Sequence, residues 1–215
     1  MPDPVTVSGA VPTLWSAALT MSGTILSATI ASTVGGVIAL RAIWTNRAIA
    51  RLRATLDTIE RTESQEHYKH LTSVFKDFRQ SEAIQETIEE ILQPRTDAHR
   101  TRRTEILFFL NHYELIAVGF RAGVLDQGFY AEFMRGAVVR DWRAARPLIE
   151  GLRIDNEANN PVPRQIFEHF EELANEWEWE IRHEEYLARH GFNRQQVKAS
   201  LQWFRDHPKH PRPAR

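Results

Sequence analysis

The chain has 215 residues, with 27 Lys and Arg against 28 Asp and Glu, so its net charge at pH 7 is −1. It has no cysteine, which excludes disulfides, thiol nucleophiles and thiolate metal sites and leaves the redox compartment undetermined. It also lacks a P-loop, a Gly-rich dinucleotide turn and a Gly-x-Ser-x-Gly element. These absences argue against the common enzyme classes, and the near-neutral charge without a recognised module argues against a nucleic-acid partner.

The N-terminal region has no charged side chain between Pro4 and Leu40. A helix of roughly 20 apolar residues crosses the hydrocarbon core of a bilayer. We therefore expect a single transmembrane helix over residues 14–40, preceded by a short extracytoplasmic segment, 1–13. A secretory signal peptide and a buried core helix are the alternatives, but the run is long for either and its start has no Lys or Arg.

A cluster of arginines follows this uncharged segment and precedes the first downstream acid, Asp57. Positive residues near the end of a span stay in the cytoplasm. We therefore expect an N-terminus outside and a C-terminal domain inside the cytoplasmic (inner) membrane. The same side chains are candidates for contact with lipid headgroups, unless they serve as topology anchors alone. They are Arg41, Arg47, Arg51 and Arg53.

Small residues recur every four positions inside the predicted span. Because positions i and i+4 stack on one helix face, they form a smooth stripe along which two helices can approach closely in lipid. We expect self-association through this stripe; an unrelated partner helix and chance composition are the alternatives. Its members are Gly23, Ser27, Ala31, Gly35 and Ala39.

Apolar residues at heptad-like spacing continue beyond the span, in a predicted juxtamembrane helix over residues 41–63. This seam would extend the transmembrane contact into a stalk, as in a short parallel coiled coil. The alternative is that it packs on the protein's own C-terminal domain. The seam consists of Ile49, Leu52, Leu56 and Ile59.

The rest of the chain shows apolar residues at helical spacing and no run that alternates as a strand does. We expect an all-α fold, with a cytoplasmic multi-helix bundle over residues 64–206 and a disordered tail, 207–215. Ser81, Thr96 or Asp97, and Asp126 are predicted to begin helices, and Gly123 to end one. Residues 127–134 and the segment from Val138 onward are expected as separate helices, and residues 155–163 as a loop.

Several motifs in the region 108–153 are similar to those of the DUF4760 family, bacterial and phage proteins of unknown function. They are Asn111-His112-Tyr113-Glu114-Leu115-Ile116-Ala117-Val118-Gly119, Gly123-Val124-Leu125-Asp126, Phe133-Met134-Arg135-Gly136, Val139-Arg140-Asp141-Trp142 and Pro147-Leu148-Ile149. The resemblance covers most of residues 37–180. It implies a single-pass membrane anchor with a cytoplasmic all-α domain, and it supplies no catalytic residues.

Polar residues of the first motif lie among apolar neighbours. A buried carboxylate is costly unless paired, so we expect Glu114 to pair with an arginine of the following helices (Arg121, Arg135, Arg140 or Arg143). This pairing would belong to an ion-pair network that determines how the helices cross. The alternative is that Asn111, His112, Glu114 and Arg140 line a polar pocket for a small ligand or a partner's tail.

Metal binding has one weak candidate, the Glu-x-x-His pair Glu180 and His183, whose spacing is that of di-iron helical bundles. A di-metal site needs a second such motif, which the sequence lacks. The acids around it resemble the solvated face of one long helix, and Trp179 among them is a candidate contact for a partner. We expect neither a metal nor another cofactor.

Together these features favour a membrane-anchored helical interaction or scaffold module that self-associates through its span and stalk. Its expected partners are the membrane, further copies of the chain, and another protein. An enzyme or effector with a metal or small-ligand site in the bundle is the first alternative. A membrane-perturbing effector is the second.

Overall fold

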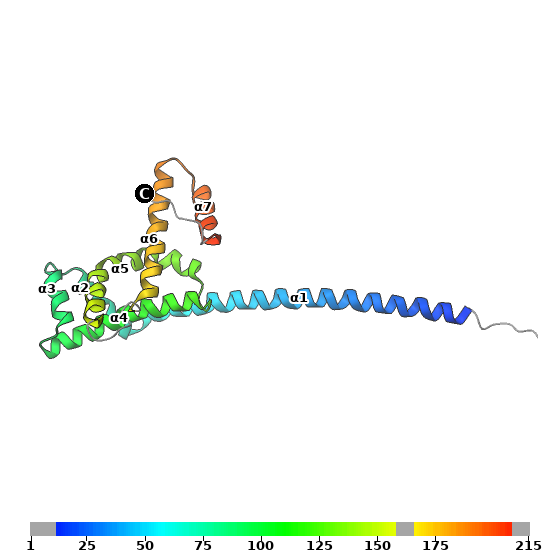
Figure 1. The fold of residues 1–215 in the computed structure, drawn as a ribbon, viewed down its shortest axis with the longest axis horizontal. Helices are drawn as coiled ribbons and strands as arrows, with labels where there is room; N and C mark the ends of the chain where they lie inside the picture. The colour runs from blue at the N-terminus through cyan, green and yellow to red at the C-terminus, as the bar shows by residue number, and fades with distance from the viewer. Residues whose placement is uncertain (1–11, 158–165, 208–215) are drawn as a thin grey trace, which may run out of the picture. The chain divides into compact units, whose positions relative to one another are not determined.

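The structure is a computed structural model that describes the backbone of residues 12–157 and 166–207 and the side chains of residues 36–154 and 166–207. Within these ranges the regular structure is exclusively helical, which confirms the all-α prediction for them (Figure 1). The helices are α1 (Pro12–Ser64), α2 (Glu66–Arg79), α3 (Ile84–Leu92), α4 (Asp97–Arg121), α5 (Gln127–Glu157), α6 (Glu168–Arg189) and α7 (Arg194–Asp206). The chain divides into two compact units, residues 1–50 and 51–215.

A search of the described residues finds no helix that combines the length and the apolar character needed to cross a membrane. The predicted span, 14–40, lies mainly among residues whose side chains are not described. Apart from their edges, the predicted segment 1–13, loop 155–163 and tail 207–215 also lie outside the described residues.

The core of the second unit surrounds α4, which packs against α2, α3 and α6, while α5 packs against α6, α3 and α2. Aromatic rings join these helices: Phe75 stacks on Phe109 with centroids 4.3 Å apart, and Tyr113 stacks on Phe170 at 4.9 Å. Trp177 of α6 is fully buried. Burying one such side chain contributes about 1.5–3 kcal/mol to stability, so these contacts hold α6 to the bundle.

Three helix ends have the local chemistry that the sequence predicts. The Thr96 side chain accepts a hydrogen bond from His99 N–H, and the Asp126 carboxylate accepts one from Phe129 N–H at 2.9 Å. Gly123 follows the end of α4 with a φ of 66°, a left-handed conformation that glycine adopts without strain. The prediction for Ser81 is wrong, because α3 begins after Ala83 without a side-chain cap and the Ser81 hydroxyl lies against Thr87 instead.

The expected break between residues 134 and 138 is also wrong. Helix α5 is continuous from Gln127 to Glu157 and even includes Pro147. A single glycine in a helix costs only about 1 kcal/mol, so Gly136 does not interrupt it. The burial of Tyr130, Val138 and Trp142 along one stripe outweighs that cost.

Candidate functional site

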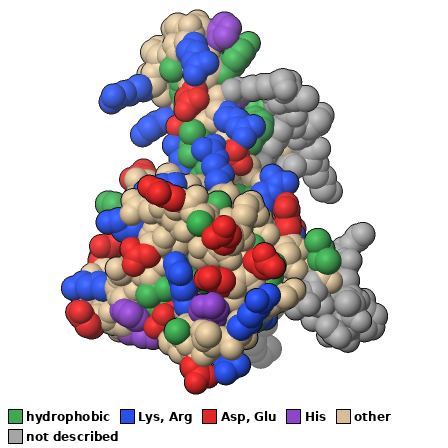
Figure 2. Space-filling model, turned by 90° about the vertical axis from the view of Figure 1, so that its left-hand side faces the viewer, with side chains coloured by type: hydrophobic (Ala, Val, Ile, Leu, Met, Phe, Trp, Pro, Cys, Tyr) green, Lys and Arg blue, Asp and Glu red, His purple; other side chains and the backbone are tan. Residues whose placement is uncertain are grey.

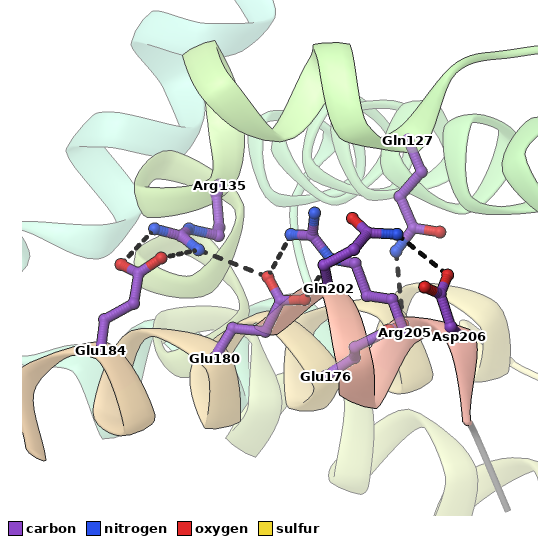
Figure 3. A network of polar contacts seen from close by, with 8 residues as sticks. All are labelled: Gln127, Arg135, Glu176, Glu180, Glu184, Gln202, Arg205 and Asp206. Atoms are coloured by element: carbon purple, nitrogen blue, oxygen red, sulfur yellow. Dashed lines mark hydrogen bonds and ion pairs between the residues drawn. The ribbon is translucent and has the colours of Figure 1, made fainter. Parts of the chain in front are cut away.

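A buried carboxylate lies where α5, α6 and α7 meet. Glu180 of α6 is only 2% exposed. Arg205 of α7 binds it with two hydrogen bonds of 2.8 Å, one to each carboxylate oxygen, and Arg135 of α5 approaches Oε2 at 3.3 Å (Figure 3). Bidentate guanidinium–carboxylate contacts are among the stronger polar interactions in proteins. The two arginines thus tie three helices to one acidic group.

Arg135 has a second partner on α6. Its Nη1 and Nη2 atoms donate hydrogen bonds of 2.8 and 2.6 Å to the two oxygens of Glu184, one helical turn beyond Glu180. Burial lowers the pKa of the Arg135 guanidinium, but hydrogen bonds to Glu184 and Glu180 outweigh burial and raise it. Arg135 therefore stays charged, and its donors are directed at α6.

His183, the histidine of the Glu-x-x-His pair, also contacts α7. His183 Nε2 lies 3.0 Å from the Ser200 hydroxyl, and its ring stacks on Trp179 with centroids 4.7 Å apart. Phe204 of α7 meets both rings edge-on. The prediction that Glu180 lies on a solvated face is wrong, and Trp179 contacts a helix of its own chain. Across the described residues, no group of three or more His, Cys, Asp and Glu is arranged to hold a metal ion.

A groove of about 410 Å³ opens beside this network between α5, α6 and α7. The groove is lined by both acidic and basic side chains, and its two arginines, Arg135 and Arg205, bind carboxylates of α6. On the face of the molecule drawn in Figure 2, acidic and basic side chains are likewise interspersed. The lining residues are Gly128, Ala131, Glu132, Arg135, Glu184, Lys198, Leu201, Gln202 and Arg205.

The four residues of the predicted polar pocket do not converge. Asn111 is exposed, and Arg140 contacts the Asp141 carboxylate. His112 Nε2 lies 3.0 Å from the Thr62 hydroxyl, its ring packs on Tyr68, and burial lowers its pKa. The polar residues of this motif thus contribute to separate contacts between helices.

Glu114 binds the start of α6 instead of an arginine, so that predicted pairing is wrong. Its Oε2 accepts the Phe170 N–H at 2.8 Å, and its Oε1 lies 2.8 Å from His169 Nδ1. Phe167, the residue before α6, has a φ of 58° and provides no side-chain cap. A carboxylate at a helix N-terminus satisfies unpaired N–H groups and complements the helix dipole. Glu114 therefore caps a helix 55 residues away.

A second buried carboxylate, Asp141 of α5, was not predicted. It is 4% exposed and pairs with Arg79 of α2 and Arg140, while the Tyr113 hydroxyl donates a hydrogen bond of 3.0 Å to its Oδ2. Burial and the Asp141 charge raise the pKa of Tyr113 well above its ordinary value. The sequence could have indicated this burial, because Asp141 lies three positions after Val138 and therefore on the apolar stripe of α5.

The resemblance noted in the sequence is confirmed by a match to the family model described as a domain of unknown function, DUF4760, over residues 29–177. The chain belongs to the DUF4760 family. No curated protein and no solved structure matches the chain. The DUF4760 match includes Glu114, Arg135 and Asp141 and ends at Trp177, so Glu180 and α7 lie beyond it.

The predicted headgroup and stalk residues of this DUF4760 chain lie on α1. Ile49, Leu52 and Leu56 are exposed, whereas Ile59 packs against the hydrophobic core. In the small-residue stripe only Ala39, which is exposed, has a described side chain; Gly23, Ser27, Ala31 and Gly35 lie outside the described side chains. The four arginines Arg41, Arg47, Arg51 and Arg53 are exposed.

A threonine face of α1, not predicted from the sequence, packs on the domain. Thr55 is fully buried; its hydroxyl donates to the Arg51 carbonyl and accepts the Asp126 N–H, each at 2.8 Å. Thr58 and Thr62 follow on the same side of the helix, each bonded to the carbonyl four residues earlier. The spacing of three and four residues between these threonines could have indicated from the sequence that they share one face of the helix.

Proposed function

We propose that this chain is a membrane-anchored helical interaction module that self-associates through α1. The observation that carries this proposal is the exposure of large apolar side chains around the described part of α1. Ile38 is 63%, Ile43 47% and Trp44 71% exposed. Taken at about 100° per residue, Ile43 and Trp44 lie about 140° and 240° around the helix from Ile38. Large apolar side chains exposed on several sides of a helix are suited to an apolar environment.

The surrounding sequence supports an anchor. The exposed apolar residues continue the uncharged segment 4–40, and arginines are interspersed with them from Arg41 onward. Guanidinium groups at that position suit the headgroup layer of the inner leaflet, with the apolar segment in the hydrocarbon core. The proposal therefore includes an N-terminus outside and the helical domain in the cytoplasm.

Self-association is supported by what the domain leaves uncovered on α1. The buried side of the helix carries Thr55, whereas Leu56 lies about 100° away and is 52% exposed. Leu52 lies on the same side as Leu56 and is exposed too. An apolar pair that its own domain does not cover is suited to a second copy of the stalk.

Anchoring and topology can be tested with the full-length protein. Because the chain has no cysteine, single variants Ser8→Cys and Ser73→Cys report the side of the membrane through an impermeant maleimide. We expect only Ser8→Cys to react in intact cells, both to react after permeabilisation, and the protein to float with vesicles at pH 11. Extraction at pH 11, or labelling of Ser73→Cys in intact cells, would contradict the proposal.

Self-association can be tested by native mass spectrometry in mild detergent. We expect a discrete oligomer that is weakened by Leu52→Ser combined with Leu56→Ser and by Gly35→Leu. The matched control, Leu115→Ser combined with Val118→Ser, removes two exposed apolar side chains of α4 and should leave the oligomer intact. A monomeric wild-type protein would reject self-association.

A further inference from the structure

Helix α7 is attached to the domain by few apolar contacts. Of its thirteen residues, Leu201 alone is buried. Helix α7 packs on α6 (Figure 1), where Phe204 is partly buried against Trp179 and His183. The polar network adds the bonds of Arg205 to Glu180 and of Ser200 to His183. One buried leucine and one partly buried phenylalanine are a small share of the apolar burial that holds a whole domain together.

The connection between α6 and α7 is a short turn, closed on α6 by the N–H groups of Gly191 and Phe192, which bond to the carbonyls of Ala188 and Leu187. It runs from His190 to Asn193 and includes Gly191, whose φ is 81°. Helix α7 also begins with its own capping box, in which the Asn193 and Gln196 side chains each accept the other's backbone N–H at 2.9 Å. Its first turn is therefore satisfied by α7 residues, and no other helix is needed to cap it.

Glu180 has a second counter-ion that does not belong to α7. A buried carboxylate that loses its partner is strongly destabilising, which would normally hold α7 in place. Here Arg135 comes from α5 and lies 3.3 Å from Glu180, independently of α7. Figure 3 shows Glu180 between the two guanidinium groups. The duplicated arginine lowers the electrostatic penalty of release.

From these observations we propose that α7 is a releasable latch. It swings away from α6 about the turn at residues 190–193, as a folded or partly folded unit, while α2 to α6 stay packed. In the closed state it covers Glu180, His183 and Trp179. In the open state it uncovers this face of α6, with Glu180 held by Arg135. The device is separate from the proposed membrane anchor, because none of its residues belongs to α1.

Hydrogen exchange followed by mass spectrometry on the full-length protein in detergent tests the latch. We expect the amides of α7 to exchange at least about 100-fold faster than those of α4, because local opening costs less than global unfolding. Arg205→Ala should accelerate exchange in α7 by about tenfold more and leave α4 and α5 unchanged. The matched control, Gln195→Ala, alters an exposed side chain of α7 and should change little.

A second experiment checks that the uncovered face recaptures α7. A fluorescent peptide of residues 191–207 should bind the full-length Leu201→Asp variant at least about tenfold more tightly than it binds wild-type protein, whose own α7 occupies the face. The same peptide with Arg205→Ala should bind the variant about tenfold more weakly. The latch is rejected if wild-type α7 and α4 amides exchange equally slowly, if Arg205→Ala accelerates all helices alike, or if the peptide does not distinguish the two proteins.

Discussion

The Glu114 carboxylate on α4 caps α6 by accepting the Phe170 N–H at 2.8 Å. The contact joins the centre of α4 to the first turn of α6. Phe167, the residue before α6, has a left-handed backbone conformation, and its side chain does not cap the helix. Glu114 thus has a structural role in the relative placement of α4 and α6.

Removing this cap should destabilise the domain. We expect Glu114→Ala to lower the free energy of unfolding by about 1–2 kcal/mol, the usual cost of a lost N-cap. Urea denaturation followed by circular dichroism measures it. Glu172→Ala, which removes an exposed carboxylate paired with Arg121 on the surface, should cost less than about 0.5 kcal/mol. Equal losses from the two variants would contradict the capping role.

The Asp141 network should behave as a coupled unit. Asp141→Ala leaves Arg79 and the Tyr113 hydroxyl without their acceptor, so we expect a loss of about 3 kcal/mol. Tyr113→Phe should cost about 1–2 kcal/mol alone and much less in the Asp141→Ala background. A double-mutant cycle of unfolding free energies measures this coupling. Strict additivity would mean that the hydroxyl and the carboxylate act independently.

His112 should make stability depend on pH in a defined window. Burial lowers its folded pKa below the ordinary value of 6.5, so between these two values the unfolded chain binds more protons than the folded chain. Stability contributed by neutral His112 is then fully present above pH 6.5 and falls as the pH drops below it. Denaturation of wild type and His112→Gln at pH 7.5, 6.5 and 5.5 checks this. The variant should show a smaller decrease, and an identical decrease would exclude His112 as its source.

The threonine face of α1 gives a test of how the helix joins the domain. Thr55→Val removes the acceptor of the Asp126 N–H and should cost about 1–3 kcal/mol, because that buried donor loses its partner. Thr45→Val alters an exposed residue whose hydroxyl bonds only to the Arg41 carbonyl in the described structure, and should change stability by less than about 0.5 kcal/mol. Thermal unfolding in detergent compares the two, and a silent Thr55→Val would reject the contact.

The sequence alone determined the features that arise within one or two turns of chain. Thr96, Asp126 and Gly123 mark helix ends in the structure because caps and left-handed glycines act on neighbouring backbone groups. Helical periodicity and the motifs around Asn111 likewise sufficed for the all-α class and for the family. In the described residues these predictions needed no knowledge of which helices touch.

Tertiary structure decided the roles of the polar residues. Glu114, Asp141 and Glu180 are acidic residues on amphipathic helices. The sequence around each is compatible with a carboxylate exposed to solvent and with one that is buried against another helix. Asp141 and Glu180 are buried and Glu114 is partly buried. Each has a partner at least 25 residues away in the chain: the first turn of α6 for Glu114, Arg79 for Asp141 and Arg205 for Glu180. The free energy of a carboxylate depends on the donors and the dielectric around it. Those surroundings exist only after the helices have packed.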